Sequence, residues 1–189
     1  VILPGFIDAH NHFTMMGSQR SELDLGGIHN RKDIIEKIRQ ENAKLDPQMP
    51  IIGFNYEFDV IHQDHRICAA DLEAIAPDRM IQISDRGGHL SVTTQSTLKK
   101  AGILLNSREY SDCIFAYGGN FGGFTGEICG VANSLLSDYM RIQFRDDQAL
   151  KRAWKQASEI ATEHGVTSIH ALVVEEEFEK LIQFQNQLP

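Results

Sequence analysis

The chain has 189 residues, of which 42% are hydrophobic and 23% charged, the composition of a globular protein with enough apolar side chains for a core. Its net charge of −8 and its scattered basic residues argue against a nucleic-acid partner, because such a partner requires a clustered positive face. No stretch approaches the roughly 18 consecutive apolar residues of a membrane-spanning helix, so we expect no membrane partner either.

The first predicted element is a strand over residues 1–7. These residues are almost all apolar, which is typical of a strand that is covered on both faces in a parallel sheet. The strand leads directly into residues 8–12, which include Asp8, His10 and His12.

A helix is predicted over roughly residues 31–45. Asn30 can cap its first turn, apolar residues then repeat at helical spacing, and Pro47 follows its end. Residues 51–54 and 80–84 have the composition of short strands.

Two shorter helices are predicted in the middle of the chain. Residues 71–76 form one, which ends before Pro77, and residues 94–101 form the other, which Gly102 can close. The segment from residue 113 to residue 130 differs, because glycines alternate there with aromatic and apolar residues. That pattern favours a hairpin or flap over a helix.

The last fifty residues predict a helix, a strand and a second helix. Asp146 or Asp147 can cap the first helix, which ends near Gly165. Residues 166–170 have strand character, and a helix begins near Glu175. This succession is typical of an α/β protein.

His10 and His12 are the first candidate site residues. They are two positions apart on the predicted strand, so both side chains project from one face, with Cα atoms about 6.6 Å apart. Imidazoles at that spacing can bind one divalent cation at about 2.0–2.1 Å. Asp8 lies on the same face and is placed to orient the pair through hydrogen bonds. The carboxyl end of a strand is where α/β barrels and open sheets place their sites.

The stretch from Pro4 to His12 closely resembles the first barrel strand of the amidohydrolase superfamily of metal-dependent hydrolases. Later landmarks are similar to one branch, the amidohydrolase-3 type, and they are Gly88-His89, Leu98, Ala101-Gly102-Ile103, Thr125-Gly126 and residues 165–170. The resemblance therefore spans nearly the whole chain.

The resemblance implies a (β/α)₈ barrel in which His10 and His12 bind one or two divalent metal ions, usually zinc. It implies that metal-activated water cleaves a non-peptide amide-type C–N bond of a small-molecule substrate. Residues 1–16 would then form the first barrel strand, residues 17–145 an α+β insertion over the barrel mouth, and residues 146–189 a helix, the second barrel strand and the next helix. The other metal ligands and an aspartate general base would come from later strands.

The length of the chain predicts an incomplete barrel, because 189 residues fall below even the roughly 200 of the smallest barrels. Two histidines are also too few for a catalytic zinc, which usually has three protein ligands and a water. We therefore expect this segment alone to be inactive and to bind metal weakly, with a dissociation constant in the roughly micromolar to millimolar range. A barrel cut after its second strand exposes strand edges, so self-association into a homo-oligomer is a further expectation.

Two other histidines are candidates for a position that faces the substrate. His89 follows two glycines, and His170 lies at the end of a predicted strand; loop stabilisation and core packing are the alternative interpretations. His62 and His65, with the neighbouring Arg66, are instead typical of a solvated turn.

One departure from the family pattern leaves a second function open. Where many members of the branch carry a glutamate, this chain has Gly130. A non-catalytic regulatory or binding protein that keeps the hydrolase scaffold is therefore the alternative, because a scaffold alone does not guarantee activity. The three cysteines, Cys68, Cys113 and Cys129, form no C-x-x-C pair, which fits a reducing compartment and a cytoplasmic location.

Overall fold

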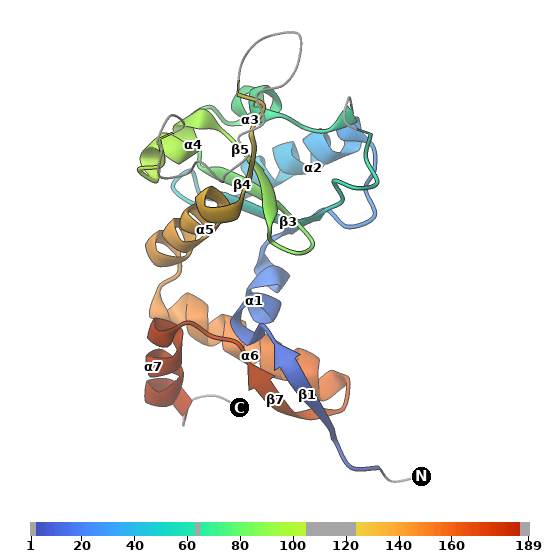
Figure 1. Ribbon diagram of the computed structural model, residues 1–189, viewed down its shortest axis with the longest axis vertical. Coiled ribbons are helices and arrows are strands. Elements are labelled where there is room, and N and C mark those ends of the chain that lie inside the picture. The colour runs from blue at the N-terminus through green and yellow to red at the C-terminus, as the bar shows by residue number, and fades with distance from the viewer. Residues whose placement is uncertain (1–2, 63–64, 105–123, 186–189) are drawn as a thin grey trace. The chain divides into compact units, whose positions relative to one another are not determined.

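The computed structural model describes residues 3–62, 65–104 and 124–185 (Figure 1). The chain divides into two compact units, each of which combines strands with helices in a mixed α/β fold. The first unit comprises Val1–Ser21 and Arg145–Pro189, and the second comprises Glu22–Phe144. Among the helices of the described ranges, none is both long enough and apolar enough to cross a membrane.

A five-stranded mixed sheet forms the centre of the second unit. Its strands, in spatial order, are β2 (Leu23–Asp24), β3 (Ile51–Tyr56), β4 (Ile81–Asp85), β5 (Leu90–Thr93) and β6 (Glu127–Cys129). The first three are parallel, and β5 runs antiparallel to both β4 and β6. The helices of this unit are α2 (Arg31–Lys44), α3 (Ala69–Ile75), α4 (Gln95–Lys100) and α5 (Gly130–Phe144).

Each face of this sheet carries its own hydrophobic core. Ile51 of β3 belongs to a cluster with residues of α2 and α3, whereas the next residue, Ile52, packs against a second cluster with residues of α4 and α5. Successive side chains of a strand point to opposite faces, so helices cover the sheet on both sides.

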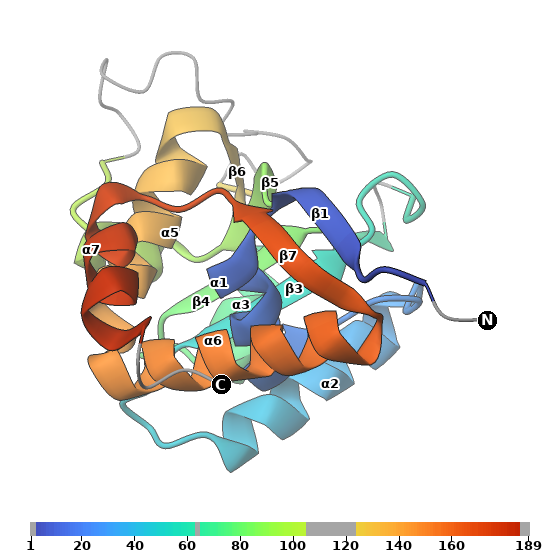
Figure 2. The ribbon, with the colours of Figure 1, turned by 90° about the horizontal axis from the view of Figure 1, so that it is seen from below.

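The first unit is built on two parallel strands, β1 (Phe6–Asn11) and β7 (Val166–Ala171), which lie side by side in Figures 1 and 2. Asp8 pairs with Ile169, and Asn11 pairs with Ala171. The helical elements of this unit are α1 (Phe13–Ser18), the short 3₁₀ turn Gln19–Ser21, α6 (Asp147–Glu163) and α7 (Glu175–Phe184).

Close contact between α1 and α6 holds the first unit together. The indole Nε1–H of Trp154, which is fully buried, donates a hydrogen bond to Oγ1 of the buried Thr14 at 2.9 Å. One turn further along α1, a Cβ on Gly17 would lie 1.7 Å from the backbone oxygen of Ala153. Only glycine allows the two helices to approach so closely.

The strand β1 is not covered on both faces, contrary to the sequence-based expectation. Phe6 and Ile7 are 62% and 66% exposed, because β7 is the one strand that pairs with β1 in the described ranges. An apolar parallel strand normally has neighbours on both edges and helices on its faces. The described residues supply only part of that cover.

Several predicted elements are confirmed. The helix predicted over residues 31–45 is α2, and Oδ1 of Asn30 caps it by accepting the N–H of Lys32 at 2.8 Å. The predicted strands at 51–54 and 80–84 are β3 and β4, and the elements predicted after residue 146 are α6, β7 and α7. Of the predicted flap, residues 113–123 lie outside the described residues, and its described end contains β6.

The elements that were not predicted from the sequence are α1, the 3₁₀ turn Gln19–Ser21, β2, β5 and α5. The cysteines Cys68 and Cys129 are half-buried and free, and Cys113 lies outside the described residues.

Candidate functional site

His10 and His12 lie together at the carboxyl end of β1. The strand ends at Asn11, and His12 precedes the first residue of α1, with its backbone oxygen accepting the N–H of Met16 at 2.9 Å. The two imidazole centroids are 5.7 Å apart, and the ring planes make an angle of 76°. The imidazoles of His10 and His12 are therefore close in space, which their spacing in the sequence only suggested.

The geometry of this pair fits two ligands of one cation. Two imidazoles that bind a single zinc ion at about 2.1 Å with tetrahedral angles have ring centroids roughly 5 Å apart. The observed 5.7 Å is slightly wider, and both side chains are exposed. Across the described ranges, no hydrogen bond occupies a ring nitrogen of either histidine, so their lone pairs are available to a metal.

Asp8 supports the backbone beneath the pair rather than the rings themselves. Its Oδ2 accepts a hydrogen bond from Nδ2 of Asn11 at 2.8 Å, and its Oδ1 accepts the backbone N–H of His10 at 3.1 Å. The hydrogen bond from Asn11, followed by that from His10, holds the pKa of Asp8 below its usual value. The carboxylate therefore stays charged and places a negative charge next to the histidines.

Asn11 contributes an unusual feature of the site. Its Oδ1 is buried and has no hydrogen-bond partner in the described part of the chain. Buried polar atoms nearly always have a partner, so an orphaned oxygen marks a place where a polar ligand or water can bind.

The two other candidate histidines lie in different units. His170 lies on β7, one residue before the partner of Asn11, so strand pairing brings it to about the level of His10. It is exposed. His89 lies in the second unit, in the exposed turn between β4 and β5. Strand pairing thus brings His170 to the level of His10, whereas His89 lies in the other unit.

The described residues do not provide a complete metal site. Nowhere in the described ranges do three His, Cys, Asp or Glu side chains come together as metal ligands. A catalytic zinc usually has three protein ligands, so the imidazoles of His10 and His12 would be a partial set.

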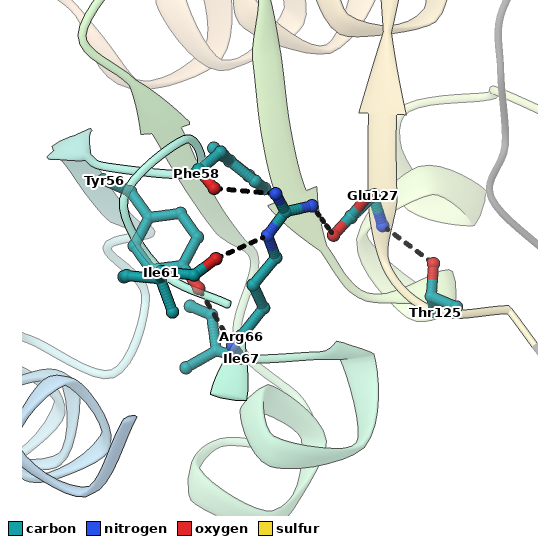
Figure 3. Close-up of polar contacts among 7 residues, drawn as sticks. All are labelled: Tyr56, Phe58, Ile61, Arg66, Ile67, Thr125 and Glu127. Atoms are coloured by element: carbon teal, nitrogen blue, oxygen red, sulfur yellow. Dashed lines mark hydrogen bonds and ion pairs between the residues drawn. The ribbon is translucent and has the colours of Figure 1, made fainter. Parts of the chain in front are cut away.

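His62 and His65 are exposed, as expected for a solvated turn, but the side chain of the neighbouring Arg66 is half-buried. Figure 3 shows its half-buried guanidinium, whose Nη1 lies 3.3 Å from Oε1 of Glu127 and whose Nη2 donates to the backbone oxygen of Phe58 at 2.7 Å. Its Nε donates to the backbone oxygen of Ile61 at 3.3 Å. Arg66 thereby ties the loop after β3 to β6. No local signal could reveal this role, because Glu127 lies 61 positions along the chain.

Tyr56 fixes the same loop from inside the core. Its hydroxyl oxygen accepts the backbone N–H of Ile67 at 3.0 Å, as Figure 3 shows. Burial raises the pKa of Tyr56 to about 12, so the phenol remains neutral.

Comparison with known proteins identifies a family that matches nearly the whole chain and relatives that match part of it. The model of the family described as "Amidohydrolase family" matches residues 1–187. YtcJ of Bacillus subtilis, whose name describes it as a proposed amidohydrolase, is 24% identical over 136 residues, which are 72% of this chain and 26% of that protein. An N-substituted formamide deformylase of Arthrobacter pascens is 23% identical over 110 residues, which are 57% of this chain and 20% of that enzyme.

A solved structure has a similar fold. The crystal structure of an uncharacterized metal-dependent hydrolase from Pyrococcus horikoshii matches with a TM-score of 0.69 and 20% identity. The match covers 97% of this chain and 34% of that one. The chain thus spans at most about a third of the length of these relatives.

Proposed function

The chain belongs to the amidohydrolase family, and we propose that it is part of a metal-dependent hydrolase that cleaves a non-peptide amide-type C–N bond of a small molecule. The observation that carries this proposal is the pair of imidazoles at the carboxyl end of β1, with His10 and His12 centroids 5.7 Å apart and ring nitrogens free of protein partners.

The proposal includes a barrel that is only partly present in residues 1–189. In it, β1 and β7 are the first two parallel strands, α6 is the crossover helix that precedes β7, and the second unit is an insertion between them. The exposed apolar side chains of Phe6 and Ile7 support this architecture, because further barrel elements would cover them. The greater length of the relatives supports it as well.

Each residue of the site has a definite task in the proposed reaction. The ring nitrogens of His10 and His12 would hold a divalent cation, and their imidazole chemistry suits zinc. Such a cation polarises a carbonyl and acidifies water. Asp8 fixes the backbone of His10 through its N–H and would add negative charge next to such a cation. His170, at the level of His10 on the adjacent strand, would contact the substrate.

With two imidazole ligands, residues 1–189 alone should bind zinc weakly and should not turn over substrate. The missing ligands and general base would come from the rest of the barrel. The activity proposed here is therefore that of the full-length protein.

Hydrolysis of N-benzylformamide by the full-length protein tests the proposal. We expect chelation of the metal to abolish release of benzylamine, and added zinc to restore it. His10→Ala and His12→Ala should each reduce the rate at least about 100-fold, since each removes a ligand of the activating cation. His164→Ala is the matched control, because the side chain of this exposed histidine of the same unit has one hydrogen bond within the described residues, to the backbone oxygen of Ile160. Hydrolysis that survives both ligand substitutions would contradict the proposal.

A further inference from the structure

The strand β1 carries one extra residue just before it ends. Asp8 pairs with Ile169, and Asn11 pairs with Ala171. Three steps along β1 therefore match two steps along β7, which is a β-bulge. Bulges are uncommon between parallel strands and occur preferentially next to active sites, where they change the direction of a side chain. The bulge of β1 includes His10, one of the two candidate metal ligands.

The bulge brings the side chains of Asp8 and Asn11 together. Residues three positions apart on a regular strand project from opposite faces. In β1, however, Nδ2 of Asn11 donates a hydrogen bond to Oδ2 of Asp8 at 2.8 Å. The extra residue reverses the alternation of the strand, so the two side chains can meet.

The contacts of these two side chains enclose His10. Oδ1 of Asp8 accepts the backbone N–H of His10 at 3.1 Å. The backbone oxygen of Asn11 accepts the N–H of Leu172, just after β7, at 2.7 Å. The side chain of Asn11 therefore links the carboxylate that holds His10 to a backbone position that is bonded to the neighbouring strand.

The charge of Asp8 determines the orientation of the Asn11 amide. A carboxylate attracts the Nδ2 donor, whereas it would repel Oδ1 in the same place. This orientation leaves Oδ1 of Asn11 buried and, within the described residues, without a hydrogen-bond partner. A buried acceptor without a partner lowers the stability of a fold. Stability therefore does not explain the asparagine at this position, and its contact with Asp8 indicates a role at the site.

We propose that Asn11 is a positioning residue of the cation site, which holds the bulge closed through Asp8 and thereby keeps the imidazole of His10 beside that of His12. The inference rests on the proposed hydrolase function, in which the two imidazoles bind one divalent cation. Their centroids, 5.7 Å apart, lie close to the separation that a shared zinc ion requires. A pair that is held in this geometry before binding loses less conformational freedom when the cation binds.

Asn11→Leu separates this role from a structural one. Leucine keeps the branched shape of the side chain but lacks the donor to Asp8 and the buried oxygen. Asp8 is only half-buried, so water can replace the lost donor. We therefore expect the thermal unfolding midpoint of the metal-free, full-length protein to equal that of the wild type. Exchange of the His10 amide hydrogen should nevertheless accelerate at least about tenfold.

The zinc affinity of the full-length protein is the decisive measurement. It is determined by competition with a chelator of known affinity and read from the Cε1–Hε1 NMR signals of His10 and His12, with histidine labelled with carbon-13. Asn11→Leu should weaken zinc binding at least about tenfold, as is usual when a residue that supports a metal ligand is removed. Asn11→Ala should do the same, so the result does not depend on how leucine packs.

Two further variants serve as controls. Ala161→Gly changes a buried residue of α6 and leaves the side-chain hydrogen bonds of residues 8–11 in place. It should lower the unfolding midpoint through the poor helix propensity of glycine and keep the zinc affinity of the wild type. In an Asp8→Ala background, Asn11→Leu should have no further effect on zinc affinity, because Asn11 acts through Asp8.

Three results would overturn the proposal. They are wild-type zinc affinity in Asn11→Leu and Asn11→Ala, additive effects of Asn11→Leu and Asp8→Ala, and a loss of zinc affinity in Ala161→Gly as large as that in Asn11→Leu. Zinc that shifts neither the His10 nor the His12 signal of the wild-type protein would overturn the cation site and this inference together. A wild-type protein that binds zinc through both histidines but does not hydrolyse N-benzylformamide would contradict the proposed function alone.

Discussion

Removal of the hydrogen bond between Trp154 and Thr14 is the strongest single test of how the first unit is held together. Thr14→Val keeps the branched shape of the side chain but removes the acceptor of the indole N–H. Both residues are buried, so the N–H would lose its partner without gaining access to water. An unsatisfied buried donor costs about 1–3 kcal/mol, and we expect a loss of about 2 kcal/mol in the free energy of unfolding of the first unit.

Urea unfolding followed by tryptophan fluorescence measures this loss directly, because Trp154 is the single tryptophan of the sequence and lies in the first unit. With a slope of about 2 kcal/mol per molar urea, the midpoint should fall by roughly 1 M. Thr162→Val is the control, since the hydroxyl of this exposed threonine of α6 has one hydrogen bond in the described part of the chain, to the backbone oxygen of Ser158. A midpoint for Thr14→Val that equals that of the control would refute the reasoning.

Three further predictions concern packing, capping and pH. Gly17→Ala should destabilise the first unit by about 3 kcal/mol in the same assay, because the new Cβ meets the backbone oxygen of Ala153, which no rotamer change can move away. A urea midpoint for Gly17→Ala equal to that of the wild-type protein would contradict the close approach of the two helices. Asn30→Ala should cost about 1 kcal/mol in thermal unfolding through loss of its cap, and an unchanged melting temperature would argue against that cap. The N–H of Gly26 holds the pKa of Asp24 below its usual value. The charged carboxylate of Asp24 therefore stabilises the folded state above roughly pH 4, and this stabilisation is lost as the pH falls through the folded-state pKa of Asp24. Asp24→Asn should therefore reduce the dependence of stability on pH in acid, and identical pH profiles would contradict this assignment.

Helices with strong local signals could be predicted from the sequence. Asn30 and Asp146 each cap a helix through a side-chain oxygen, at Lys32 N and Ala149 N respectively, and both helices were predicted close to their observed positions. Capping and periodicity depend on residues within a few positions of each other, so they are visible without the fold.

Elements that depend on tertiary contacts could not be predicted in this way. The helix α1 has six residues and no side-chain cap, and its stability comes from contacts of Thr14 and Gly17 with α6. The helix α5 begins at Gly130, which has a φ of +56° and directly follows β6. The glycines before β6 favour irregular structure. The buried Asn133 of α5 has described partners on β4, on β5 and in the turn between them. Such partners are far apart in the sequence and leave no local pattern.

The candidate site was predicted in part. The neighbouring positions of His10 and His12 follow from the two-residue repeat of a strand, which is a local property. The hydrogen bonds of Asp8 to the backbone of His10 and to the side chain of Asn11 were not predicted. They depend on where β1 ends and on the side-chain conformations of Asp8 and Asn11 at that end. The exposure of β1 depends on which elements surround it, and no pattern within the strand carries that information.

The most direct test of the account is a zinc titration of this chain, labelled with carbon-13 at Cε1 of histidine. If His10 and His12 bind one cation together, their two signals should shift with the same midpoint, at a dissociation constant in the roughly micromolar to millimolar range expected for two ligands. Substitution of either histidine by alanine should weaken the response of the other at least about tenfold. Separate midpoints for the two imidazoles, or no response at either while other histidines bind zinc, would contradict the account.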